Sequence, residues 1–166
     1  MDSDEELIAQ FARGSREAFE ELFARYREPL YGFFRRRLDS RERAEDLAQE
    51  TFLAVIRGAP RWEPKALVRT WLYGIALKLL YAERRKLQRG APSESVVVGE
   101  AEDTKLWIRQ ALARLDATER EILMLREYEQ LSYAEIAELL RIPVNTVRSR
   151  LFRARMALRD CLKGEV

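Results

Sequence analysis

The sequence predicts an all-α protein composed of two small helical domains. Glycine and proline, which interrupt helices, number only 7 and 5 among 166 residues. Apolar residues recur at the spacing of an amphipathic helix along most of the chain. The exception is the stretch 89–103, where glycine, proline and serine replace the helical pattern. We therefore expect helical domains over 1–88 and 104–166, joined by a flexible linker over 89–103.

Composition excludes several classes of function. The 30 basic and 28 acidic residues nearly cancel, and an acidic stretch over 91–103 separates two mildly basic blocks. Histidine is absent and Cys161 is the single cysteine. The commonest general base and metal ligand is therefore missing, together with any internal disulfide. We expect no catalytic residues, no metal and no cofactor.

The chain also lacks the marks of a membrane or secreted protein. No apolar stretch is long enough to span a bilayer. The acidic start, Met1 to Glu6, is unlike a signal peptide. We expect no membrane insertion and a cytoplasmic location.

Four helices are predicted in the first domain. The first covers 4–12 and stops before Gly14, and Ser15 caps the second. Pro29 lies inside the second helix and predicts a kink or irregularity there. The inner side of this helix carries Phe19, Leu22, Phe23, Tyr26, Leu30 and Phe34. The third helix covers 40–57, and the fourth covers 65–87 after a loop that contains two prolines and a glycine.

The third helix has two distinct faces. Six small or apolar residues form the face that we expect in the core: Ala44, Leu47, Ala48, Thr51, Ala54 and Val55. The opposite face carries Asp46, Gln49, Glu50 and an exposed leucine, Leu53. A lone exposed leucine is ordinary, whereas a leucine ringed by carboxylates and an amide suits protein docking. The residues alone leave both interpretations open, but they offer no set of groups suited to catalysis.

The fourth helix combines an apolar stripe with a basic side. The stripe begins at Leu67 and includes Trp71, which suits a place in the core. Tryptophan beside basic residues is also suited to stacking on an unpaired base, and the sequence leaves this alternative open. The basic side carries Arg69, Lys78, Arg84, Arg85, Lys86 and Arg89.

The second domain is predicted to hold four helices that end in a helix-turn-helix. A fifth helix contains Trp107 to Leu115, and a sixth opens with an acidic first turn over 116–121. Ser132 and Glu135 form a capping box, so a seventh helix starts at Tyr133. Pro143 excludes the preceding residue from the α region and suits the first turn of an eighth helix. Two short helices joined by a tight turn are typical of a DNA-binding helix-turn-helix.

The eighth helix also separates its residues by face. Val144, Val147, Leu151, Ala154 and Leu158 fall within one arc and are expected to face the core. Opposite lie Asn145, Arg148, Ser149, Phe152, Arg153 and Arg159, with Arg150 and Arg155 on the flanks. A solvated basic face is the simpler interpretation of these arginines. The cap, turn and second helix in register favour DNA binding, because arginine pairs with guanine edges and phosphates.

The run 131–155 resembles a known promoter-reading element. It contains Ser-Tyr-x-Glu-Ile-Ala, then Pro-Val-x-Thr-Val-Arg-Ser-Arg, then Arg-Ala-Arg. This pattern resembles region 4 of bacterial RNA polymerase sigma factors, most closely the extracytoplasmic-function (ECF) group, although response-regulator DNA-binding domains share part of it. The resemblance implies that the upstream promoter element is contacted by Asn145, Thr146, Arg148, Ser149, Arg150, Phe152, Arg153 and Arg155.

A second motif is one that response regulators lack. The segment 44–52, Ala-Glu-Asp-Leu-Ala-Gln-Glu-Thr-Phe, resembles sigma region 2.2, the helix that grips the clamp coiled coil of the largest polymerase subunit. Carried over to this chain, the resemblance implies that core polymerase is bound by Asp46, Gln49, Glu50 and Leu53.

A third segment, 69–76, is similar to sigma regions 2.3 and 2.4. In the ECF group this segment and the loop before it capture the opened strand of the downstream promoter element. The implied contacts are Arg61, Trp62, Arg69, Trp71, Lys78, Arg84 and Arg85. The family usually has asparagine where this chain has Lys78. Lysine cannot accept a hydrogen bond, so the family's base preference does not carry over, and a phosphate contact by Lys78 is the alternative.

The resemblance implies an ECF-type sigma factor that binds core RNA polymerase and directs promoter recognition and DNA melting without catalysis of its own. It also implies an anti-sigma factor as a partner. The residues leave two other classes open. One is a stand-alone helix-turn-helix repressor or activator, usually a dimer on a palindrome. The other is a helical adaptor whose basic helix binds an acidic protein.

Overall fold

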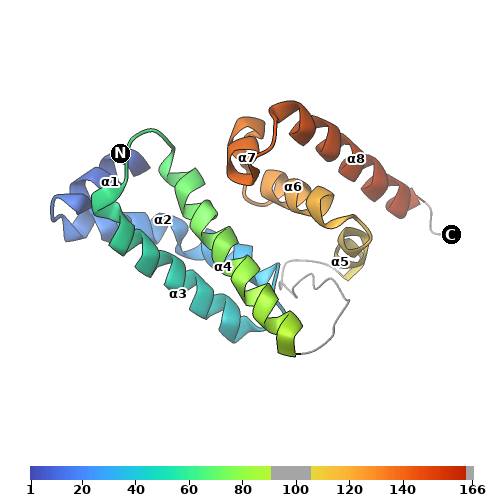
Figure 1. The fold of residues 1–166 in the computed structure, drawn as a ribbon, viewed down its shortest axis with the longest axis horizontal. Coiled ribbons are helices and arrows are strands. Elements are labelled where there is room, and N and C mark those ends of the chain that lie inside the picture. The colour runs from blue at the N-terminus through green and yellow to red at the C-terminus, as the bar shows by residue number, and fades with distance from the viewer. Residues whose placement is uncertain (91–105, 164–166) are drawn as a thin grey trace. The chain divides into compact units, whose positions relative to one another are not determined.

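The computed structural model describes residues 1–90 and 106–163 (Figure 1). These residues form helices and turns, and no strand occurs among them. The chain divides into two compact units, one of residues 1–34 with 40–94 and the other of residues 35–39 with 95–166. The predicted all-α fold with two helical domains is confirmed. The linker expected over 89–103 lies almost wholly outside the described residues, and its bounds stay a prediction.

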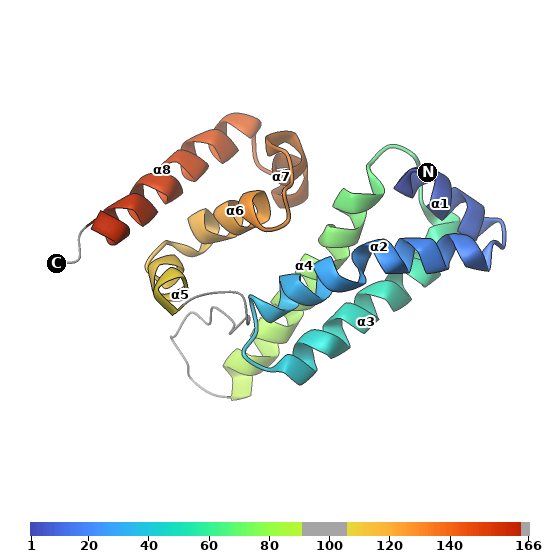
Figure 2. The same ribbon diagram turned by 180° about the vertical axis from the view of Figure 1, so that it is seen from behind.

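The first unit contains α1 (Asp4–Ala12), α2 (Arg16–Arg35), α3 (Arg41–Gly58), the 3-10 turn η1 (Ala59–Arg61) and α4 (Val68–Gly90). Helix α4 packs against α3, and α2 lies behind this pair in Figure 1 and in front of it in Figure 2. The core between them is aliphatic and aromatic. Its fully buried members include Ile8, Leu22, Leu30, Phe33, Phe34, Val55, Leu72 and Leu80.

Local signals place the ends of these helices where the sequence predicts them. Ser3 caps α1 in a capping box with Glu6, in which Ser3 Oγ accepts the Glu6 N–H at 3.1 Å and the Glu6 carboxylate accepts the Ser3 N–H at 2.9 Å. Gly14 then turns the chain at a φ of +108°, a conformation that side chains disfavour. Ser40 caps α3 by accepting the Arg43 N–H at 3.1 Å.

Helix α2 includes Pro29 as an exposed residue within its bounds, and the kink or irregularity expected there stays a prediction. Another expectation for the first unit needs correction. Helix α4 begins at Val68 and not at residue 65. As a result Leu67 stays outside the apolar stripe and is 48% exposed. The cause is a tertiary contact, because the Glu5 carboxylate of α1 accepts the Val68 N–H at 2.8 Å and caps the helix there.

The second unit contains α5 (Leu106–Ala113), α6 (Ala117–Glu127), α7 (Tyr133–Leu140) and α8 (Val144–Lys163). Helix α6 packs against both α7 and α8, and α5 contacts α8. Asp116 caps α6 by accepting the N–H groups of Thr118 and Glu119 at 2.8 and 3.0 Å. The buried guanidinium of Arg120 closes α5, since it donates to the carbonyls of Leu112 and Leu115 at 2.8 and 2.6 Å.

Candidate functional site

The turn between α7 and α8 has the predicted helix-turn-helix geometry. Ser132 Oγ accepts the Glu135 N–H at 3.0 Å, and Glu135 Oε1 accepts the Ser132 N–H at 3.1 Å, which completes the capping box. Helix α7 ends at Leu140, and the C-cap residue Arg141 takes the left-handed conformation at φ 58°. Pro143 then precedes the first residue of α8. The local signals in the sequence were sufficient to place both helices.

One side of α8 is buried and the other is exposed, as the periodicity predicts. Val147, Leu151 and Ala154 are almost fully buried. The opposite face exposes Asn145, Arg148, Ser149, Phe152 and Arg153, while Thr146 and Arg150 are half-buried. Phe152 is 64% exposed, an unusual fraction for a phenylalanine. The face is therefore basic, with one apolar side chain that the fold does not use.

The two flanking arginines are engaged within the second unit. Arg155 Nη2 lies 2.8 Å from Glu127 Oε1, and this hydrogen bond raises the pKa of the guanidinium. Arg150 contributes, after the backbone donors, to lowering the pKa of Asp116. Within the part of the chain that the structure describes, neither Arg148 nor Arg153 has an acidic partner. Both side chains are exposed and are therefore available for contacts outside the protein.

The hydroxyl of Ser149 is also engaged. Its Oγ donates to the backbone carbonyl of Thr146 at 3.1 Å, one turn earlier in the same helix. Serine often makes this kind of bond within a helix. The bond fixes the hydroxyl in place on the exposed face.

The residues predicted at the downstream element form two groups on α4. Trp71, Lys78 and Arg85 recur at seven-residue intervals and share one side of the helix, while Arg69 and Arg84 project from another. Lys78 and Arg85 are exposed, and Arg69 and Arg84 are half-buried.

Arg61 is the last residue of η1, and Trp62 is the C-cap that follows it. Arg61 is exposed, whereas the Trp62 indole is half-buried, and its Nε1 is buried without a hydrogen-bond partner among the described residues. A buried N–H without an acceptor is uncommon in native proteins.

Trp71 is half-buried, and its ring packs closely against Gly58. A Cβ added at Gly58, the last residue of α3, would lie 2.8 Å from Trp71 Cζ2. This distance is shorter than any van der Waals contact, so only glycine admits the indole there. This contact supports a structural role for part of the indole, and base stacking by its exposed part stays a prediction.

The outer face of α3 carries the residues predicted to dock on polymerase. Leu53 is 52% exposed, and Gln49 and Glu50 are exposed beside it. Asp46 is half-buried because Arg43 Nη1 binds its carboxylate at 2.9 Å. The structure thus holds the four side chains on one face, with one of them fixed by an ion pair.

This face continues into a groove that the sequence did not predict. The groove has a volume of about 460 Å³, lies between α2 and α3, and is lined in part by Phe23, Arg27, Tyr31, Gln49 and Phe52. Phe23 was expected on the inner side of α2 but is 39% exposed. The four-residue spacing of the three α2 residues is the signal that identifies this outer stripe.

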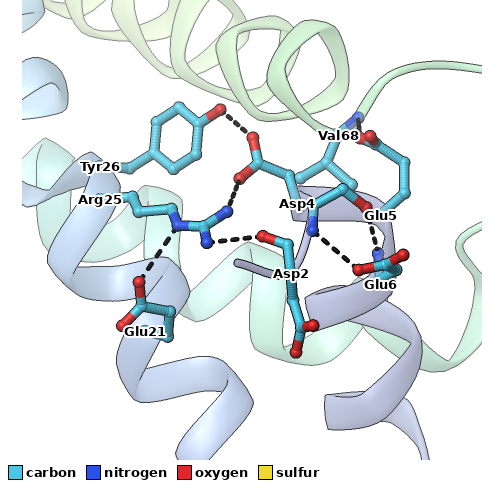
Figure 3. A network of polar contacts seen from close by, with 9 residues as sticks. Asp2, Asp4, Glu5, Glu6, Glu21, Arg25, Tyr26 and Val68 are labelled. Carbon is cyan, nitrogen blue, oxygen red and sulfur yellow. Dashed lines mark hydrogen bonds and ion pairs between the residues drawn. The ribbon is translucent and has the colours of Figure 1, made fainter.

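A second feature absent from the sequence interpretation is the network around α1 (Figure 3). Asp4 accepts a hydrogen bond from the Tyr26 hydroxyl and another from Arg25 Nη1 at 2.9 Å. Arg25 also donates to the carbonyl of Asp2 at 2.6 Å. Burial, followed by the bond to Asp4, raises the pKa of Tyr26. The acidic start of the chain therefore ties α1 to α2.

The structure adds two observations on site chemistry, both limited to residues 1–90 and 106–163. No cluster of three or more cysteine or acidic side chains there could hold a metal ion. No helix of that part of the chain has both the length and the apolar character needed to cross a membrane.

Comparison with known families assigns the two units. The family model described as Sigma-70 region 2 matches residues 22–90, and that described as Sigma-70, region 4 matches residues 105–158. RNA polymerase sigma-H factor of Pseudomonas aeruginosa is 30% identical, over 98% of this chain and 95% of the relative. The chain belongs to the sigma-70 family. ECF RNA polymerase sigma-E factor of Haemophilus influenzae is 31% identical, over 92% of each chain. Its name assigns that relative to the ECF group, which the sequence motifs also indicate for this chain.

Solved structures show the same fold over both units. The chain matches CnrH, solved in complex with the cytosolic domain of CnrY, with a TM-score of 0.77 at 27% identity over 99% of this chain and 100% of that one. It matches the sigma factor RpoE, solved with the anti-sigma factor NepR from Bartonella quintana, with a TM-score of 0.72 at 27% identity over 89% and 98% of the two chains. The predicted family, and with it the function of an ECF-type sigma factor in transcription initiation, is confirmed.

Proposed function

We propose that this sigma factor uses three separate surfaces during initiation. Helix α8 reads the upstream promoter element, α4 with the preceding loop captures the opened downstream strand, and the outer face of α3 binds core RNA polymerase. The observation that carries the proposal is the pair of unrelated exposed faces, a basic one on α8 and an acidic one with a central leucine on α3. The proposed domains are 1–88 and 104–166, with a linker over 89–103.

The proposed upstream contacts divide by chemistry. Arg148 and Arg153, which have no acidic partner among the described residues, are suited to forks with guanine or phosphate. Phe152 offers an apolar surface of the kind that contacts a thymine methyl group. Arg150 and Arg155 lie at the flanks of this face, which suits contacts with backbone phosphates. Arg155 would have to exchange its bond with Glu127 for such a contact. Asn145, Thr146 and Ser149 complete the surface at the start of the helix.

The proposed polymerase contact depends on charge as well as shape. Asp46 and Glu50 repel phosphate, so DNA does not explain their face of α3. A basic helical surface with apolar residues does explain it, with Leu53 as the apolar anchor and Gln49 as a hydrogen-bonding group. We assign this partner as the clamp coiled coil of the largest polymerase subunit.

The downstream contacts are proposed for Arg61 and Trp62 in the loop and for the basic residues of α4. Lys78 and Arg85 share a side of α4 and suit phosphates of a single strand. Trp62 is half-buried, and the exposed part of its indole is proposed to contact that strand. Arg69 and Arg84 are proposed to lie at the edge of this contact surface. Half-buried Trp71 is proposed to support the surface through its packing on Gly58.

Further parts of the proposal concern partners and location. The similarity to RpoE, which was solved with an anti-sigma factor, supports an anti-sigma factor as a partner of this chain. We assign the protein to the cytoplasm, where polymerase and DNA are found. It carries no catalytic residues, metal or cofactor of its own, and the chemistry of transcription belongs to the polymerase.

The decisive experiment is reconstitution with core polymerase. The protein is mixed with core enzyme and a randomised library of double-stranded DNA, and the transcripts are sequenced. We expect transcripts that share two sequence elements at a fixed separation and that require the protein. Binding of DNA without any protein-dependent transcript would reject the sigma mechanism and favour a stand-alone helix-turn-helix regulator.

A further inference from the structure

Helix α1 connects the two ends of the loop that carries the downstream contacts. It packs against η1, where the loop begins, and against α4, where the loop ends. Leu7 and Ile8 are the apolar residues of α1 that are buried in this packing. Residues 62–67 between these ends contain no helix. The span and direction of the loop are therefore set by the element that joins its ends.

Glu5 makes the polar contact at the second end. Its carboxylate accepts the N–H of Val68, the first residue of α4, at 2.8 Å (Figure 3). An acidic group at this position satisfies a donor that has no partner inside the helix and interacts favourably with the helix dipole. Arg69 follows directly, so the first turn of α4 and its side chains are fixed by a residue sixty-three positions earlier in the chain.

The position of Glu5 is held by the contacts of its neighbour in the chain. Its neighbour Asp4 binds Arg25 and the hydroxyl of Tyr26 on α2, and the Tyr26 side chain is buried. Adjacent residues of one helical turn thus contact two different helices, α2 through Asp4 and α4 through Glu5. Rotation or sliding of α1 would break both contacts.

We propose that Glu5 is a positioning residue for the capture of the opened strand. By capping α4 it sets where Arg61, Trp62 and Arg69 lie relative to one another, and so it determines how selectively the loop reads unpaired bases. The proposal rests on the downstream role given to these residues in the proposed function. Because a carboxylate occupies the Val68 N–H, the selectivity belongs to the loop side chains and not to the end of the helix.

Three single variants in the full chain test the role of Glu5. Glu5→Ala removes the cap, whereas Glu5→Gln keeps an oxygen that accepts the Val68 N–H. Glu6→Ala is the matched control, because it breaks the α1 capping box with Ser3 and because Glu6, unlike Glu5, caps no residue of α4 among the described residues. Each variant is examined by hydrogen exchange of the Val68 amide. Each is also assembled with core polymerase and presented with DNA that holds a short randomised unpaired stretch, from which the bound sequences are recovered.

Glu5→Ala is expected to accelerate Val68 exchange and to lower the preference for the best unpaired sequence by about threefold to tenfold, the equivalent of one lost hydrogen bond. Glu5→Gln and Glu6→Ala should keep the wild-type preference. An unchanged preference in Glu5→Ala would overturn the proposal. An equal loss in Glu6→Ala would also overturn it, because general weakening of α1 would then be the cause. If the wild-type holoenzyme selects no unpaired sequence, the proposed downstream function fails first, and this outcome is distinct from the other two.

Discussion

Arg43 of α3 and Glu83 of α4 are joined by two parallel hydrogen bonds. Arg43 Nε and Nη2 lie 2.8 and 2.9 Å from the two carboxylate oxygens of Glu83. The Glu83 side chain is only 7% exposed, and the hydrogen bond from Arg43 is the main cause that lowers its pKa. The third nitrogen of Arg43 binds Asp46 at 2.9 Å. The position of Asp46 on the outer face of α3 thus depends on a buried residue of α4.

Loss of the Glu83 charge should destabilise the first unit. We expect Glu83→Gln to lower the free energy of unfolding by about 1–3 kcal/mol, because Arg43 loses its ionised partner. Denaturation followed by the fluorescence of Trp62 and Trp71, in a Trp107→Phe background, measures this unit. Glu28→Gln, an exposed site on α2, is the control and should change little. Equal effects of the two changes would show that the buried pair adds nothing.

Leu53 should be the apolar anchor for core polymerase. We expect Leu53→Ala to weaken polymerase binding by at least about tenfold, as truncation of an interface hot spot does. Folding should be unaffected, because the side chain is 52% exposed. Leu87→Ala, at a leucine of α4 that is 56% exposed, is the matched control. Titration of labelled core enzyme measures both, and the docking assignment is wrong if the two variants bind alike.

Arg153 should read one base pair of the upstream element. We expect Arg153→Ala to cost about 1–3 kcal/mol of binding when the preferred base pair is present, and much less when it is replaced. Binding to a panel of single-substituted sites measures this difference. Arg159→Ala removes the same charge further along α8 and should weaken all sites alike. A uniform loss in Arg153→Ala would reassign this residue to a phosphate.

Asp116 should make the second unit sensitive to acid. Backbone donors from Glu119 and Thr118, with Arg150 nearby, hold its pKa below the usual 3.8. The folded state thus binds this proton less tightly than the unfolded chain. The charge-dependent stability is present above about pH 4 and is lost as the pH falls through the lowered pKa.

Asp116→Asn keeps the capping oxygen and removes the titration. The stability advantage of the wild type over this variant, measured by denaturation, should therefore shrink between about pH 6 and about pH 3. Other groups titrate equally in both proteins, so their contributions cancel. An advantage that stays constant with pH would contradict the assigned role of the Asp116 charge.

Arg141 should be a site where glycine stabilises the helix-turn-helix. A residue with a Cβ pays about 1 kcal/mol in the left-handed conformation, which glycine adopts freely. We expect Arg141→Gly to raise the free energy of unfolding of the second unit by up to about that amount. Arg141→Ala removes the same charge but keeps the Cβ, so it separates strain from electrostatics. Equal melting temperatures for the two variants would argue against strain at this turn.

The features that could be predicted from sequence depend on neighbouring residues. The Ser132–Glu135 capping box and Pro143 fix their helices through contacts within one turn, and both ends lie where expected. The alternation of buried and exposed positions on α8 follows from helical geometry alone. For the same reason most candidate residues of α3 and α8 are exposed as the sequence predicts, whereas Asp46, Thr146 and Arg150 are half-buried.

The features that could not be predicted depend on residues distant in sequence. Helix α4 starts at Val68 because of Glu5, and no local signal near residue 68 indicates this cap. Hydrophobicity alone predicts Phe23 in the core. Helix α2 carries more apolar residues than fit on its buried side, and Phe23 lies on the exposed stripe that lines the groove. The sequence likewise could not show that Asp46 is paired through Arg43 to α4.

The hydrogen bond from Ser149 to the Thr146 carbonyl uses the hydroxyl proton at one position on the exposed face of α8. While this bond holds, the hydroxyl offers its lone pairs and not its proton to an approaching group. A hydroxyl in this state accepts hydrogen bonds from the amino groups of adenine and cytosine. It does not donate to phosphate oxygens or to the carbonyl oxygens of guanine and thymine. In this state Ser149 acts only as a hydrogen-bond acceptor on the exposed face of α8, although a serine hydroxyl can in general both donate and accept.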